Sequence, residues 1–171
     1  ESATAHPLQA LTDAITIEEL KTKKKPKVVL SWAPHVKALP QAVANSFIKM
    51  MQEVDVDFSI THPEGYDLDT NITKDIPVNY NQEEALKDAD FVYVKNWSSY
   101  TNYGQILFKD ISWMLTKEKL GNAKFMHCLP VRRNLVVEDA VIDSDQSVVI
   151  KQANNRTFAA QIVLKKILEN L

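Results

Sequence analysis

The feature that most restricts the fold is a short, continuously apolar segment, KVVLSW, running from Lys27 to Trp32. Its apolar residues follow one another instead of alternating with polar ones, which is typical of a strand buried on both faces of a parallel sheet. Strand character recurs at residues 57–61, 90–94, 124–128 and 147–150. Apolar residues at helical spacing predict helices over residues 4–20, 40–54, 82–86, 137–142 and 155–171.

Strands that alternate with helices favour right-handed crossovers and helices on both faces of one sheet. The sequence therefore predicts a three-layer, Rossmann-like α/β domain with a mainly parallel five-stranded sheet flanked by helices. We expect three parts: an N-terminal helix over 1–20, the α/β domain over 21–152 and a C-terminal helix over 153–171. The Lys-rich stretch at 21–27 is interpreted as a solvated linker.

The composition restricts the function as well. The net charge of −2 provides no global field for binding nucleic acid or an anionic membrane, and no apolar stretch approaches the roughly 20 residues of a membrane span. The single cysteine, Cys128, cannot form an internal disulfide, so a reducing cytoplasm is expected. Without a glycine-rich loop or a Cys/His cluster, we expect no nucleotide, cofactor or metal. A start at Glu1 instead of Met favours a fragment of a longer protein.

Cationic side chains follow several of the predicted strands. Lys95 follows the third strand, Arg132 and Arg133 follow the fourth, and Arg156 comes after the fifth. Because ligands of parallel sheets bind outside the carboxyl ends of the strands, these cations suit a ligand with carboxylate or phosphate groups. His35, which follows the first strand, is a neutral or cationic helper. The alternative is that each arginine forms an ordinary surface ion pair.

The segment His127-Cys128-Leu129-Pro130 is the densest candidate site. A thiol beside an imidazole allows a cysteine nucleophile, but neighbours on a strand point to opposite faces, which disfavours that mechanism. A buried, inert thiol is the simpler interpretation. A third is that Pro130 bends the chain and exposes the carbonyls of Cys128 and Leu129, which then accept from an NH2 group of a ligand.

His6 and Gln9 lie three residues apart in the segment HPLQ and share one helix face. Together they suit a small group that carries both a carbonyl and an amine, although a capping or surface role fits equally well.

These segments, taken together, resemble the aspartate/ornithine carbamoyltransferase family. HPLQ is similar to its HPxQ motif, HCLP to a motif of the ornithine branch, and Asn155-Arg156 to the arginine motif of that branch. The resemblance implies that His6 and Gln9 contact the carbamoyl group of carbamoyl phosphate. It also implies that Cys128 and Leu129 accept from its NH2, and that Arg156 stabilises the oxyanion. His6, Cys128 and Arg156 are thus the implied catalytic residues.

The resemblance further implies no cofactor, and a homotrimer with active sites at subunit borders. The family's Ser-x-Arg-Thr-Arg phosphate clamp does not occur in this chain. The chain alone is therefore expected to be inactive without a phosphate-binding half, toward which residues 153–171 would pack.

Lys95 narrows the resemblance to the N-acylornithine branch, since ornithine enzymes carry an aspartate in this region. A cation there repels a free α-ammonium and suits a substrate whose α-nitrogen is acylated. The resemblance implies an acylornithine site made of Glu1, His35, Lys95, Leu129, Arg132 and Arg133. The roles of the two arginines stay undivided. Leu135-Val136-Val137, where acetyl enzymes carry a lysine, favours succinyl over acetyl without deciding it.

Three other interpretations stay open. One is an aspartate-type or ordinary ornithine carbamoyltransferase. Another is a non-catalytic, Rossmann-like module that binds small anions. The third is a cysteine-dependent hydrolase.

Overall fold

The computed structural model describes residues 2–171, so the expectation for Glu1 lies outside the described residues. The helices in these residues are α1 (Pro7–Leu20), α2 (Ala42–Met51), α3 (Thr70–Thr73), α4 (Gln82–Leu86), α5 (Lys117–Leu120), α6 (Asp139–Ile142), α7 (Val149–Leu168) and a 3₁₀ turn, η1 (Ile111–Trp113). The strands are β1 (Lys27–Trp32), β2 (Asp57–Thr61), β3 (Val78–Asn79), β4 (Phe91–Lys95) and β5 (Lys124–Met126).

All five strands are parallel and lie in the order β3-β2-β1-β4-β5. The chain winds outward from β1 through β2 to β3, and then crosses to the other side of β1 to form β4 and β5. The strand order therefore reverses between β1 and β4. In open parallel sheets the ligand binds at such a switch point, outside the carboxyl ends of the strands.

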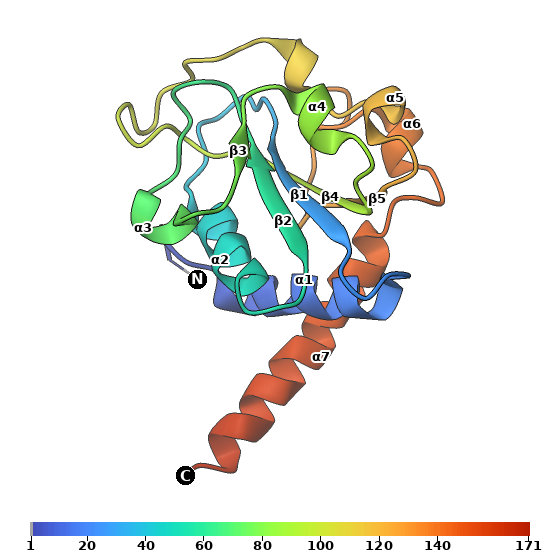
Figure 1. Ribbon diagram of the computed structural model, residues 1–171. Coiled ribbons are helices and arrows are strands. Elements are labelled where there is room, and N and C mark those ends of the chain that lie inside the picture. Colours follow the sequence, from blue (N-terminus) through green and yellow to red (C-terminus); the bar gives the residue numbers. More distant parts are fainter. Residues whose placement is uncertain (1) are drawn as a thin grey trace.

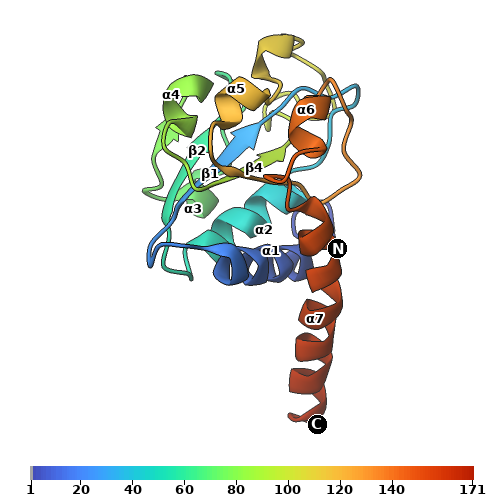
Figure 2. The same cartoon turned by 90° about the vertical axis from the view of Figure 1, so that its right-hand side faces the viewer.

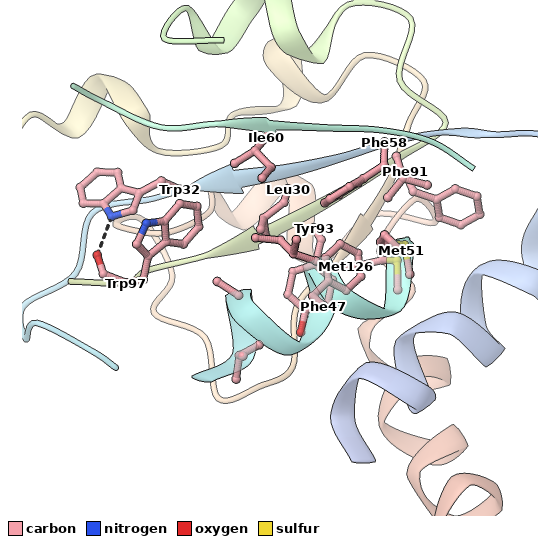
Figure 3. Close-up of a cluster of buried hydrophobic side chains, with 14 of the residues drawn as sticks. Leu30, Trp32, Phe47, Met51, Phe58, Ile60, Phe91, Tyr93, Trp97 and Met126 are labelled. Carbon is pink, nitrogen blue, oxygen red and sulfur yellow. Dashed lines mark hydrogen bonds between the residues drawn. The ribbon is translucent and has the colours of Figure 1, made fainter. Parts of the chain in front are cut away.

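Helices cover both faces of the sheet, which confirms the predicted three-layer α/β fold (Figures 1 and 2). One core lies under α1 and α2 and contains Leu30, Phe47, Tyr93 and Met126. Figure 3 shows this core, in which the Trp32 indole N–H donates to the Trp97 carbonyl at 3.0 Å. The other core lies under α4, α5 and α6, and its largest side chain is Phe125 of β5.

One predicted strand is wrong. Residues 147–150 contribute only an isolated bridge between Ser147 and Phe125, and α7 already begins at Val149, before the predicted boundary at 153. The Val148 amide donates to the Phe125 carbonyl, after which the chain turns into the helix. The fifth strand is instead β3. Its two residues are too few and too polar to give a strand pattern.

Only the first turns of α7 pack against the domain. Gln152, Asn155 and Ala159 are buried, whereas the remainder of the helix extends away from the domain (Figure 2). This extending part carries several exposed apolar side chains, namely Phe158, Ile162, Val163, Leu164, Ile167 and Leu168. Within residues 2–171, no helix is long and apolar enough to cross a membrane.

Candidate functional site

The candidate site lies at the switch point between β1 and β4. Trp32 and Lys95, the last residues of the two strands, are paired in register. Asn96 then connects the loops that follow, because its Nδ2 donates to the Ala33 carbonyl at 2.8 Å. Asn96 is not among the residues predicted from the sequence. Its position directly after a strand end was the available signal.

His35 lies in the loop after β1, close to two of the predicted cations. Its Nδ1 is 3.0 Å from the Lys37 carbonyl oxygen and 3.1 Å from the Lys37 amide nitrogen. Burial lowers the pKa of His35, and the positive charges of Arg132 and Lys95 lower it further. The structure thus brings His35 near Lys95 and Arg132, two cations of the predicted site.

Arg133 differs from Arg132. Its guanidinium donates to Asp139 at 2.8 Å and to both carboxylate oxygens of Asp143 at 2.6 and 2.7 Å. These two carboxylates raise the pKa of Arg133 above its usual range. For this residue the surface ion-pair interpretation holds, since its donors already have anionic partners. Arg132 is exposed and forms no ion pair within the described residues.

His127 is buried and neutral. Its Nδ1 accepts from the Leu129 amide at 2.9 Å, so in the neutral ring the proton lies on Nε2. Burial lowers the pKa of His127 to about 3, and the charge of Lys95 contributes less. This imidazole therefore shapes the turn after β5 and is not positioned as a base for the neighbouring thiol.

The Cys128 thiol is also held in its neutral form. Burial raises the pKa of Cys128, although nearby Lys95 opposes part of that rise. A thiolate is the form that attacks as a nucleophile, so this environment disfavours covalent catalysis. Leu129 adopts a left-handed φ of 52°, and the Leu129–Pro130 peptide bond is cis. No backbone hydrogen bond to the Cys128 or Leu129 carbonyl oxygen occurs within residues 2–171.

The other predicted contacts of the carbamoyl group are Gln9 on α1 and His6, the residue before α1. The His6 amide donates to Ser46 at 2.7 Å, and the Gln9 side chain is 2% exposed. The Nε2 of Gln9 donates to Asp13 at 2.8 Å. Asp13 has no role in the sequence analysis, although its position four residues after Gln9 places both on one helix face.

Arg156 lies on α7, near Asp13 of α1. Its helix is fastened to α1 by Asn155, whose Nδ2 donates to Thr16 at 3.0 Å and to Glu19 at 2.7 Å. The charge of Arg156 acts on the carboxyl group of Asp13, and its side chain is exposed. Arg156 is therefore available to a ligand beside α1.

A large open cavity lies elsewhere. It has a volume of about 1050 Å³ between α4 and α5 and is lined by none of the predicted site residues. A smaller hollow of about 10 Å³ lies beside His35, Lys37 and Trp97. His35 lines this second hollow, whereas Lys95 and Arg132 do not, so neither hollow encloses the whole set of predicted cations. Among the described residues, no group of three His, Cys, Asp or Glu side chains is arranged for a metal ion.

The sheet, its switch point and the groups collected there define a Rossmann-like α/β ligand-binding domain. Residues 40–167 match the family model described as aspartate/ornithine carbamoyltransferase, Asp/Orn binding domain. The chain belongs to the aspartate/ornithine carbamoyltransferase family.

Individual relatives agree with this assignment. An N-succinylornithine carbamoyltransferase from Bacteroides fragilis is 54% identical over all of this chain and 55% of that protein. Its namesake from Bacteroides thetaiotaomicron is 53% identical over the same shares. A solved mutant of N-acetyl-L-ornithine transcarbamylase, complexed with carbamyl phosphate and N-succinyl-L-norvaline, superposes with a TM-score of 0.87 at 29% identity, over 96% of this chain and 56% of that one. The chain spans about half the length of the curated relatives it matches.

Proposed function

We propose that this chain is the amino-acid-binding half of a carbamoyltransferase that acts on N-succinyl- or N-acetyl-L-ornithine in arginine biosynthesis. The observation that carries the proposal is the position of Lys95, paired with Trp32 at the switch point and close to His35. A cation at this point of the sheet attracts the α-carboxylate of an acylated amino acid and repels a free α-ammonium. The 54% identical relative supports succinyl as the acyl group.

In the proposed acceptor site, Lys95, His35 and Arg132 hold the α-carboxylate and the acyl group of the substrate. Leu129 and Glu1 are proposed as further contacts of the acceptor from the family resemblance alone. Arg133 supports the site indirectly, because its bonds to Asp139 and Asp143 brace the segment that carries Arg132.

In the proposed reaction, the neutral δ-amine of the acceptor bonds to the carbamoyl carbon of carbamoyl phosphate. The bond from that carbon to the phosphate oxygen breaks, and phosphate leaves with the proton that the amine loses. The carbonyls of Cys128 and Leu129 and the side-chain oxygen of Gln9 accept from the carbamoyl NH2, while His6 and Arg156 hold and polarise the carbamoyl oxygen. The enzyme contributes alignment and preorganised donors, and none of its residues forms a covalent bond to the substrate.

The proposed reaction needs a phosphate-binding half, which would supply the contacts to the leaving phosphate. The exposed apolar side chains of α7, among them Phe158 and Ile162, support packing of this helix against that half. A homotrimer with active sites at subunit borders, in the cytoplasm, is proposed from the family resemblance alone.

The test is an acceptor panel. The chain is fused behind the N-terminal half of the Bacteroides fragilis relative, and citrulline-type product is measured from carbamoyl phosphate with N-succinylornithine, N-acetylornithine or free ornithine. Product from an acylated acceptor alone is expected, and the faster acceptor identifies the acyl group. Product from free ornithine alone would assign an ordinary ornithine enzyme. Binding of carbamoyl phosphate without product from any acceptor would indicate an anion-binding module.

A further inference from the structure

A chain of buried polar groups connects α1, α7 and the turn after β5. The Nε2 of Gln9 donates to Oδ1 of Asp13 at 2.8 Å, and the Nε2 of Gln152 donates to the same oxygen at 2.7 Å. The Oε1 of Gln152 in turn accepts from the His127 amide at 3.0 Å. Asp13 and Gln152 are at most 1% exposed, and neither has a role in the proposed reaction.

The carboxyl group of Asp13 determines which way the two amides face. Its Oδ1 accepts from both Nε2 groups, which leaves the oxygen atom of each glutamine for another partner. The oxygen of Gln152 holds the backbone of His127, from which Cys128 and Leu129 continue. The oxygen of Gln9 is left as the acceptor for a ligand amine. A single carboxyl group thus orients both sides of the proposed carbamoyl site.

We propose that Asp13 and Gln152 are positioning residues that hold the Gln9 amide and the turn at His127 in the geometry that receives the carbamoyl group. This inference rests on the proposed function and deepens it. Neither residue touches the substrate. Each acts through a residue that does, so the expected loss on substitution appears first in carbamoyl phosphate binding.

The surroundings of Asp13 support a functional role. Its Oδ2 and the Tyr93 hydroxyl are both buried without a hydrogen bond of ordinary geometry. The groups that face the carboxyl are Tyr93 from β4, Cys128 after β5 and Arg156 from α7. Burial raises the pKa of Asp13 to about 7, and its hydrogen bonds to Gln152 and Gln9 oppose that rise. A buried carboxyl group destabilises a fold unless its interactions compensate, so a local function accounts for its presence here.

The test compares Asp13→Ala with Asp13→Asn in the fusion with the Bacteroides fragilis half. Alanine removes the acceptor, while asparagine keeps one oxygen that can accept from both glutamines. We expect Asp13→Ala to raise KM for carbamoyl phosphate about tenfold, with KM for the acceptor changed by less than about twofold. Asp13→Asn should restore most of this loss, and Gln152→Leu should resemble Asp13→Ala.

A matched control separates positioning from general destabilisation. Gln82 is also buried, and its Nε2 donates to Ser31 and to the Trp113 carbonyl, on the far face of the sheet. Gln82→Leu should lower the melting temperature and leave both KM values unchanged. In a double-mutant cycle, Asp13→Ala and Gln9→Ala should be strongly non-additive, because each removes the same oriented amide. Additive effects, or equal changes in both KM values, would overturn the inference.

A second readout does not depend on turnover. In the 171-residue chain itself, the side-chain NH2 resonances of Gln9 are assigned by NMR with the help of Gln9→Ala. They should be protected from exchange in the wild type and in Asp13→Asn, and lose protection in Asp13→Ala. Unchanged Gln9 resonances in Asp13→Ala would refute the positioning role. An inactive wild-type fusion with the expected NMR result would instead refute the proposed function and leave the oriented amide standing.

Discussion

Arg133 and Asp143 form a two-pronged ion pair, in which the two Nη atoms of the arginine lie 2.6 and 2.7 Å from the two carboxylate oxygens. In this geometry one edge of the guanidinium is occupied by Asp143 and is not available to a ligand. The adjacent Arg132 has no such partner within the described residues, and its positive charge contributes to the lowered pKa of His35. Two adjacent residues of one type therefore have different surroundings.

The first prediction separates these two arginines. Arg132→Ala should raise KM for the acylated acceptor at least about tenfold, because it removes a cation from the acceptor site. Arg133→Ala should change KM by less than about threefold and leave the melting temperature little changed, since its ion pairs are exposed to solvent. Steady-state kinetics and thermal melts of both variants check this. The opposite order of effects would exchange their proposed roles.

The second prediction concerns Lys95. Lys95→Gln should raise KM for the acylated acceptor roughly tenfold to a hundredfold, while KM for carbamoyl phosphate stays within about threefold. Lys24→Gln, in the exposed linker, is the control and should change neither value. An unaltered acceptor KM in Lys95→Gln would remove the observation on which the substrate assignment rests.

The third prediction addresses covalent catalysis. Cys128→Ala should retain kcat within about tenfold, because the proposed contact to the ligand is the backbone carbonyl and the thiol is held neutral. A residual rate about ten-thousandfold below wild type would instead assign a cysteine nucleophile. Slow alkylation of the folded chain near neutral pH, accelerated in denaturant, would confirm the buried thiol.

The fourth prediction is a pH dependence of stability. The folded-state pKa of Asp13 is raised to about 7 from 3.8, so folding favours its protonated form. Its contribution to stability is complete below about pH 4 and is lost as the pH rises through about 7. Between about pH 5 and about pH 8 the wild type should lose roughly 3 kcal/mol that Asp13→Asn does not lose. Chemical denaturation at both pH values measures the free energy of unfolding of each protein. An equal change in the wild type and in Asp13→Asn would contradict the prediction.

The fifth prediction concerns the extending part of α7. Replacing Phe158 and Ile162 by Ser should leave the melting temperature of the chain within about 2 °C, because both side chains are exposed in it. The same change should abolish activity recovered by mixing the chain with a separate phosphate-binding half. Lys165→Ser, on the same helix, is the control. Full recovery by the double variant would exclude this helix face as the contact.

The sheet was predictable where burial left a pattern. The run at β1 is located to the residue because both of its faces are buried and its side chains are mainly apolar. The run at β2 is located because buried Phe58 and Ile60 alternate with the less buried Asp57 and Ser59. The run at 147–150 has the same apolar character but meets only one bridging partner, and the chain turns helical there. A short run of apolar residues predicts that the segment is buried, but it does not predict whether the segment forms a strand or a helix.

The site was predictable in part for a related reason. Lys95, His35 and Arg132 follow strand ends, and the topology of a parallel sheet brings strand ends together. The roles of Asp13 and Gln152 could not be predicted, because their contact joins residues far apart in sequence, one on α1 and one on α7. The pairing of Arg133 with Asp143 similarly depends on a loop conformation that residue spacing does not reveal.

The hydrogen bond between Gln152 and Asp13 joins residues 139 positions apart, which affects the order in which contacts form during folding. Contacts between distant residues carry a large loop-closure cost and tend to form late in folding. During synthesis, α1 therefore emerges long before the Asp13 carboxyl group can accept the hydrogen bond from Gln152 on α7. Until α7 docks on α1, the sheet can be present while the bond between Gln152 and Asp13 is not, so the proposed carbamoyl site is completed only by the docking of these two helices.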